Sequence, residues 1–205
     1  ELVPTLAFAL FRIPLPLTPV QALAIDMGTD SLTALGLGVE RGDPALMRRP
    51  PRPRGERLLS LAVALRAYVF LGLFEAAAVL AAFFHVLDAG GWAYGTDLAA
   101  NDPLYRQATT ASFAAIVLLQ IVNVFLCRSA WRSAFSTGLG GNPLILWGVA
   151  FEAGLLVLIS YTAWGNALFG TAPLPLEVWL FLLPWAAGML AIEEARKWFV
   201  RRRSG

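Results

Sequence analysis

The sequence predicts an all-α membrane protein, a polytopic helix bundle with five full spans and a partial helix at the N-terminus. Composition is the first reason, since 58% of the 205 residues are hydrophobic and only 15% are charged. The second is that the apolar residues form long runs, and a helix of about 20 such residues crosses a bilayer. The third is that basic residues gather in particular loops, as they do on the cytoplasmic side of membrane proteins. We expect residues 1–205 to form one domain.

The first apolar stretch, Glu1–Phe11, is too short to span a bilayer, so we expect a partial helix there. Arg12–Pro16 then predicts a tight reversal, because each proline fixes its own φ and drives the preceding residue out of the helical region. The next span is expected over Leu17–Leu37. Thr18 supplies its N-cap and Pro19 its first turn.

An extended basic loop is expected next, over Gly38–Arg57, because this stretch holds six arginines among prolines and glycines. Its charge predicts a cytoplasmic position, where it sets the topology and contacts lipid headgroups. The remaining spans and their connections follow from the alternation of apolar runs with polar turns. We expect spans at Leu58–Leu87, Gln107–Cys127, Pro143–Ala163 and Val178–Ile192, outer loops at Asp88–Arg106 and Trp164–Glu177, and an inner loop at Arg128–Asn142.

Two carboxylates, Asp26 and Asp30, fall near the middle of the second apolar stretch. A charge at that depth costs about 2.5–3.5 kcal/mol on insertion scales, so paired carboxylates at i and i+4 indicate an ion site. Gly28 loosens the helix and frees backbone carbonyls, while Thr29 adds a hydroxyl. Such hard oxygen ligands suit a small cation. The alternative is that both aspartates serve only packing or pairing.

Other polar residues lie inside later spans. Gln120 and Asn123 share a helical face at i and i+3, where amides either join helices or bind an ion. Glu152 lies near the midpoint of its span, which favours an ion-related role over pairing with Gln120 or Asn123. Glu75 is also ionisable at depth, with a structural role and an ion-related role both open. The single histidine, His85, is expected to be a hydrogen-bonded or hydrated polar group.

Several motifs together resemble a known family. The runs PLPLTPVQALAIDMGTDSLTALGLG and MRRPPR resemble the sixth membrane helix and the following loop of type II P-type cation-transporting ATPases. Within that family, IDMGTD is most similar to the sodium/potassium and proton/potassium pump branch. The resemblance continues in the same order through LLQIVNVFLCRS at Leu118–Ser129, FEAGLLVLISY at Phe151–Tyr161 and EEARKWFVRRR at Glu193–Arg203.

The resemblance implies a set of cation ligands. Gln120 and Asn123 match ligand positions of the eighth membrane helix, although Asn123 stands where the sodium pump has aspartate. Glu152 matches an ion-binding glutamate of the ninth helix, and Glu1 matches one at the end of the fifth. The metal-binding residues expected from residue chemistry and resemblance together are Glu1, Asp26, Thr29, Asp30, Gln120, Asn123 and Glu152.

The function implied is that of the membrane half of an ATP-driven cation pump in the plasma membrane. The transported cation is expected to be sodium, potassium or a proton, with calcium as an open alternative because hard oxygen ligands also suit it. ATP and Mg²⁺ would act only through cytoplasmic domains, since neither the DKTGT nor the TGE motif of the family occurs in this sequence. The chain alone is therefore not expected to hydrolyse ATP.

The expected partners are membrane lipid and the N-terminal part of the pump, because the chain begins in an apolar stretch without a methionine. Nucleic acid is not expected, since the basic residues lie in loops between spans. The short outer loop Asp88–Arg106 does not favour an accessory subunit of the kind that animal pumps have. The alternative is a free-standing membrane protein or accessory subunit that retains the bundle without ATPase activity.

Overall fold

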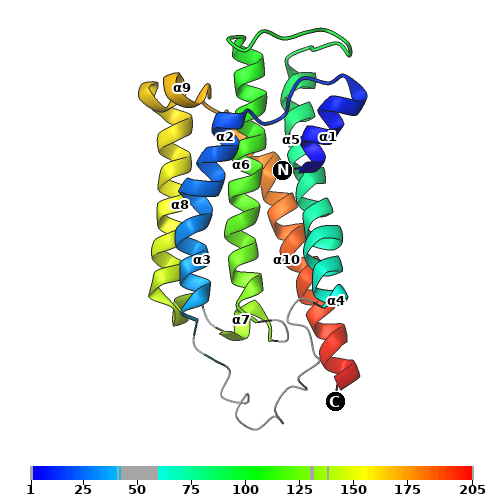
Figure 1. The fold of residues 1–205 in the computed structure, drawn as a ribbon, viewed down its shortest axis with the longest axis vertical. Coiled ribbons are helices and arrows are strands. Elements are labelled where there is room, and N and C mark those ends of the chain that lie inside the picture. The colour runs from blue at the N-terminus through cyan, green and yellow to red at the C-terminus, as the bar shows by residue number, and fades with distance from the viewer. Residues whose placement is uncertain (1, 41, 43–59, 130–131, 138, 205) are drawn as a thin grey trace.

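A computed structural model describes residues 2–40, 42, 60–129, 132–137 and 139–204. These residues form helices and connecting turns without a strand, which confirms the predicted all-α bundle (Figure 1). Within this described part, four helices are long and apolar enough to cross a membrane, and a shorter apolar helix stands at the N-terminus. The four are Leu65–Ala89, Pro103–Cys127, Pro143–Tyr161 and Leu176–Arg202.

The second expected span is helical along its length but consists of three segments. After the N-terminal helix α1 (Leu2–Phe11) and the proline-rich turn, the chain forms α2 (Pro19–Ala24), η1 (Ile25–Thr29) and α3 (Asp30–Gly38). The predicted start is confirmed, since the side chain of Thr18 accepts a hydrogen bond from the Gln21 amide at 3.3 Å. The Gln21 side chain accepts one from the Thr18 amide in return, which completes a capping box.

The next two spans are antiparallel neighbours. One consists of α4 (Leu61–Ala64), η3 (Leu65–Leu71) and α5 (Gly72–Ala89). The other is α6 (Pro103–Cys127), which begins one turn before the predicted start because Asp102 caps the Leu104 amide at 2.8 Å. Most of the predicted loop Gly38–Arg57, with the expected start of the following helix, lies outside the described residues.

The C-terminal part differs from expectation in two places. The turn after the span Pro143–Ala163 contains a short helix, because the Thr162 side chain caps the Gly165 amide at 3.0 Å. The last helix is longer than its predicted apolar part, since it continues through the charged tail. The elements are α7 (Ala134–Thr137), η4 (Leu139–Gly141), α8 (Pro143–Tyr161), α9 (Ala163–Phe169) and α10 (Leu176–Ser204).

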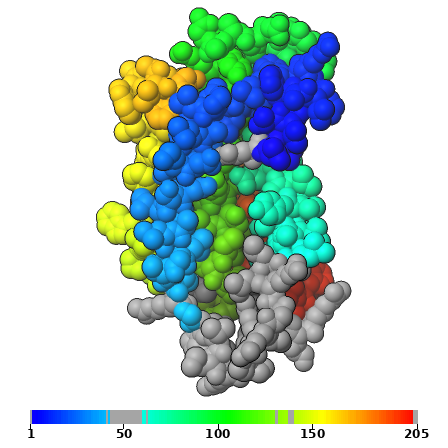
Figure 2. Space-filling model, in the orientation of Figure 1, coloured from blue at the N-terminus to red at the C-terminus, as the bar shows by residue number. Residues whose placement is uncertain are grey.

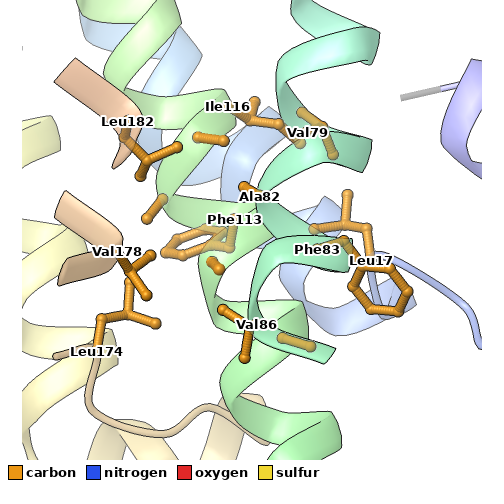
Figure 3. Close-up of a cluster of buried hydrophobic side chains, with 14 of the residues drawn as sticks. Leu17, Val79, Ala82, Phe83, Val86, Phe113, Ile116, Leu174, Val178 and Leu182 are labelled. Carbon is orange, nitrogen blue, oxygen red and sulfur yellow. The ribbon is translucent and has the colours of Figure 1, made fainter. Parts of the chain in front are cut away.

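Helix α6 lies at the centre of the bundle and is the most buried of the four long helices. Phe113 and Ile116 of α6 are almost completely buried between α5 and α10, as Figure 3 shows. The surrounding side chains in that view are Leu17, Val79, Ala82, Phe83, Val86, Leu174, Val178 and Leu182. Because α6 contacts helices on several sides, it fixes the positions of its neighbours relative to one another.

The outer ends of the helices are tied together by tyrosines. Tyr105 is buried, and its hydroxyl donates to the Leu15 carbonyl at 3.0 Å. The Tyr94 hydroxyl donates to the Phe11 carbonyl. Both bonds supply partners to carbonyls of the proline-rich turn, whose prolines cannot contribute amide donors. The outer loop therefore holds the turn between α1 and α2 in place.

At the opposite end, α10 carries a buried ionic cluster. Glu193 is fully buried and forms ion pairs with Arg66 of η3 and with Arg196, the latter at 2.7 Å. Lys197 is also fully buried and donates to the Leu126 carbonyl at 2.9 Å. These charged side chains therefore join α10 to η3 and α6.

Helices α3 and α8 cross at two glycines. A Cβ atom on Gly148 would lie 2.9 Å from Thr33 Cγ2 and 3.2 Å from the Thr33 amide nitrogen. One on Gly36 would lie 2.9 Å from Ile145 Cγ1 and 3.1 Å from its amide nitrogen. Small residues at such crossings let membrane helices approach closely and pack through their backbones.

We expect Gly148→Ala to destabilise the bundle by about 1–3 kcal/mol, because the new methyl group presses on the backbone of Thr33. Gly154→Ala on the same helix is the matched control, since nothing lies within 4 Å of a Cβ there. Unfolding by increasing sodium dodecyl sulfate in mixed micelles, followed by circular dichroism, measures both variants. Equal midpoints for the two would show that the crossing tolerates a wider separation.

Candidate cation-binding site

The motif IDMGT forms a short π-helix within the second span. The Asp30 amide donates to the Ile25 carbonyl five residues earlier, where an α-helix would bond four residues back. The Thr29 hydroxyl lies 2.9 Å from the same carbonyl. A Cβ on Gly28 would lie 2.7 Å from Leu155 of α8, so glycine also allows this segment to approach α8. Single π-turns inside α-helices occur frequently at functional sites.

The two aspartates of the motif differ in burial. Asp30 is half-buried on the side toward the bundle, whereas Asp26 is exposed on the surface of the described chain. Their charges are close enough to repel each other. Figure 2 shows the second span along one face of the molecule, with α6 recessed between α3 and α5. The spacing i, i+4 placed both aspartates on one face, but the wider π-turn leaves only Asp30 partly enclosed.

Thr29 connects this segment to α6. Its side chain is fully buried, and its hydroxyl oxygen lies 3.4 Å from Oε1 of Gln120. The single hydroxyl proton is directed to the nearer Ile25 carbonyl or to Gln120. Two predicted ligands from different helices therefore lie together, and both contribute neutral oxygen atoms.

Glu152 of α8 lies next to the same segment. It is fully buried, and its Oε1 accepts a hydrogen bond from the Thr33 hydroxyl at 2.8 Å. Its Oε2 is buried without a hydrogen-bond partner among the described residues. The Asp30 carboxylate is close enough to repel it. A buried carboxylate with one unpaired oxygen and a second carboxylate nearby is unfavourable unless a proton or a cation compensates it.

Thr33 is the residue that sequence reasoning missed. It follows Thr29 by four residues and Asp30 by three, so its hydroxyl lies on the same side of the helix as both. That spacing could have indicated a site residue. However, threonine is common in membrane helices, where its hydroxyl usually donates a hydrogen bond to a backbone carbonyl of its own helix. Thr33 does so as well, at 3.3 Å from the Thr29 carbonyl and 3.1 Å from that of Asp30. Pairing with Gln120 or Asn123 was the alternative to an ion-related role for Glu152, and the hydrogen-bond partner that the structure gives Glu152 is Thr33.

Asn123, the other candidate ligand of α6, has a partner of its own. Asn123 is half-buried on α6 and accepts a bond from Cys127 Sγ at 3.4 Å, one turn along its own helix. Glu1 lies outside the described residues. Glu75 is half-buried on α5, and His85 stacks on Phe181 with ring centroids 4.2 Å apart. In the described part of the chain, no three histidine, cysteine or acidic residues are grouped as a metal site.

The geometry thus places two carboxylates, two hydroxyls and one amide at the contact of η1, α3, α6 and α8. The acidic residues are Asp30 and Glu152, and the neutral ones are Thr29, Thr33 and Gln120. Ionisable groups inside membrane helices mark ion or proton pathways by default. Fold and site together define a polytopic helical membrane domain with a polar centre, as transport proteins have.

The chain belongs to the family described as cation transporting ATPase, C-terminus, whose model matches residues 14–199. It is 30% identical to the sodium/potassium-transporting ATPase subunit alpha of Drosophila melanogaster, over its whole length and 22% of that protein. It is 29% identical to subunit alpha-2 of Gallus gallus and to subunit alpha-4 of Rattus norvegicus, again over the whole chain and 22% of each relative. The chain therefore spans about a fifth of the length of these relatives.

Proposed function

We propose that this chain forms part of the intramembrane ion-binding site of an ATP-driven cation pump. The observation that carries the proposal is the unpaired oxygen of the buried Glu152, which lies beside Asp30 and the π-helical segment. A transported cation held by these oxygens would offset the cost of burying two carboxylates. Hydroxyl and amide oxygens from Thr29 and Gln120 would complete its shell.

Asp26 has a place in this proposal although it is exposed here. The relatives are about five times longer than this chain, since it spans 22% of them. We propose that the exposed side of η1 faces further membrane helices of the pump, and that Asp26 contributes a ligand from that side. Asn123 and Glu1 are proposed as outer members of the site, on the strength of the family resemblance alone.

ATP and Mg²⁺ are proposed to act through cytoplasmic domains encoded with this chain, and the N-terminal part of the pump is its proposed partner. The names of the relatives, which are sodium/potassium-transporting ATPase subunits, support transport of sodium or potassium. Protons and a plasma-membrane location are proposed from the family resemblance. Calcium stays as the alternative cargo, because all of the proposed ligands are hard oxygen atoms.

An ion-dependence series on the full-length protein tests the proposal. We expect ATP hydrolysis by the purified protein in lipid to rise with sodium, with potassium, or with both, at a fixed Mg²⁺ concentration. Stimulation by calcium alone would select the alternative cargo, and a rise in hydrolysis with acidity alone would indicate protons. Hydrolysis that is indifferent to all of these ions would contradict a pump, and would favour a membrane protein that retains the bundle without transport.

A further inference from the structure

Three side chains join the ends of three helices on the side of the bundle opposite the tyrosine-bonded loop. Glu40 follows α3, Arg128 ends α6, and Asn142 is the N-cap of α8. We call these three residues the clamp. All three are shielded from solvent, since the side chains of Arg128 and Glu40 are 3% and 19% exposed and Asn142 is 7% exposed.

The clamp is fully hydrogen-bonded across the three helices. Arg128 donates to both carboxylate oxygens of Glu40, from Nη2 at 2.8 Å and from Nε at 3.2 Å. Asn142 donates from Nδ2 to Glu40 Oε2 at 2.9 Å and to the Gly36 carbonyl at 2.8 Å. Its Oδ1 accepts from the Leu144 amide at 3.1 Å, so the same side chain also caps α8. Paired bonds of this kind fix orientation as well as distance.

The clamped helices are those that carry the candidate ligands. Asp30 begins α3, Gln120 is on α6 and Glu152 is on α8. Glu40 lies about three helical turns from Asp30, and an intact helix transmits a displacement over that length. Between clamp and site, Gly36 and Gly148 hold α3 against α8 at backbone contact. The clamp and this glycine crossing therefore both lie on the helices that bring Thr33 to Glu152.

We propose that Glu40, Arg128 and Asn142 are positioning residues that set the separation of the ligand-bearing helices and thereby the cation affinity of the site. This inference rests on the proposed function of the site and adds to it three residues that would touch no cation. The hydrogen bonds from Arg128 hold the pKa of the Glu40 carboxyl below its usual value. Glu40 therefore stays charged at neutral pH, and the clamp loosens only when pH falls through that lowered pKa.

The test measures apparent cation affinity of the full-length protein in lipid, for the ion that the series above identifies. We expect Glu40→Gln to weaken the cation affinity about threefold to tenfold. Asn142→Asp should weaken it as well, because it keeps the helix cap but loses the hydrogen bonds that Asn142 donates to Glu40 and to the Gly36 carbonyl. Glu177→Gln, at an exposed glutamate at the outer end of α10, is the matched control and should leave affinity unchanged. Loss of folded protein alone would lower the maximal rate without moving the affinity.

A double-mutant cycle separates the clamp from independent local effects. Glu40→Gln and Arg128→Gln should each shift affinity, and the double variant should shift it no further than the larger single change. Additive shifts, or unchanged affinity in Glu40→Gln and Asn142→Asp, would overturn the clamp. If Glu40→Gln does not fold, Glu40→Asp with the same readout replaces it. Asp30→Asn separates a failure of the clamp from a failure of the ion site. If Asp30→Asn also leaves the cation affinity unchanged, the proposed ion site is wrong. If Asp30→Asn shifts the affinity and the clamp variants do not, only the clamp is refuted.

Discussion

Asp30→Asn in the full-length protein is expected to weaken apparent cation affinity by about tenfold to a hundredfold. The change keeps the size of the side chain and removes one negative charge next to the proposed cation. A lost interaction with a charged group corresponds to about 1.5–3 kcal/mol. Asp30 is half-buried and electrostatically coupled to Glu152, so solvent screens this loss only in part. The cation concentration that half-maximally stimulates ATP hydrolysis, in the proposed ion-dependence series, measures it.

Two comparisons make this result specific. Gln120→Ala should have a smaller effect, because it removes a neutral oxygen that lies beside Thr29. Asp88→Asn is the control, since Asp88 is an exposed carboxylate at the outer end of α5. Unaltered cation dependence in Asp30→Asn would assign Asp30 to the packing of the bundle. The motif IDMGTD would then have no role in ion binding.

The second large effect concerns stability. Glu193→Gln is expected to destabilise the bundle by about 3 kcal/mol, because it leaves Arg66 and Arg196 without their shared counter-charge. The value is at the low end for a broken buried pair, since these arginines are 22% and 26% exposed and water reaches them. Unfolding in mixed micelles, as for Gly148→Ala, provides the measurement. Glu177→Gln on the same helix should be neutral.

An unchanged unfolding midpoint in Glu193→Gln would mean that the two arginines find other partners or water at no cost. A large loss of stability in Glu177→Gln would point instead to a general sensitivity of α10 to glutamate replacement. The two variants differ mainly in burial, because Glu193 is fully buried and Glu177 is exposed. Their difference in stability therefore isolates the contribution of the ionic cluster.

The spans could be predicted from the sequence because their signals are local. Thr18 and Pro19 mark a helix start wherever they precede an apolar run, and the structure forms that cap. The depth of Asp30 and Glu152 also followed from their places within apolar runs. The π-turn could not be predicted, since the bond from Asp30 to Ile25 competes closely with ordinary α-helical bonding and tertiary packing decides the outcome.

The side-chain contacts between different helices also could not be predicted from the sequence. Helix α8 is apolar on nearly all sides apart from Glu152, so its sequence does not say which side faces the bundle. The contact between Glu152 and Thr33 depends on how far α8 rotates against α3, which Gly36 and Gly148 determine. For the same reason, the partners of Glu193 and Lys197 do not follow from the sequence of α10, since they lie on η3 and α6.

The π-turn also changes what a neighbouring helix needs to supply. From one segment of five residues and the residue after it, the chain half-buries Asp30 and leaves Asp26 exposed. A helix that packs on the exposed side of η1 meets a carboxyl group that this chain already supplies. It can complete the coordination of a cation with backbone carbonyls alone, and it avoids the cost of carrying a charged residue of its own into the membrane.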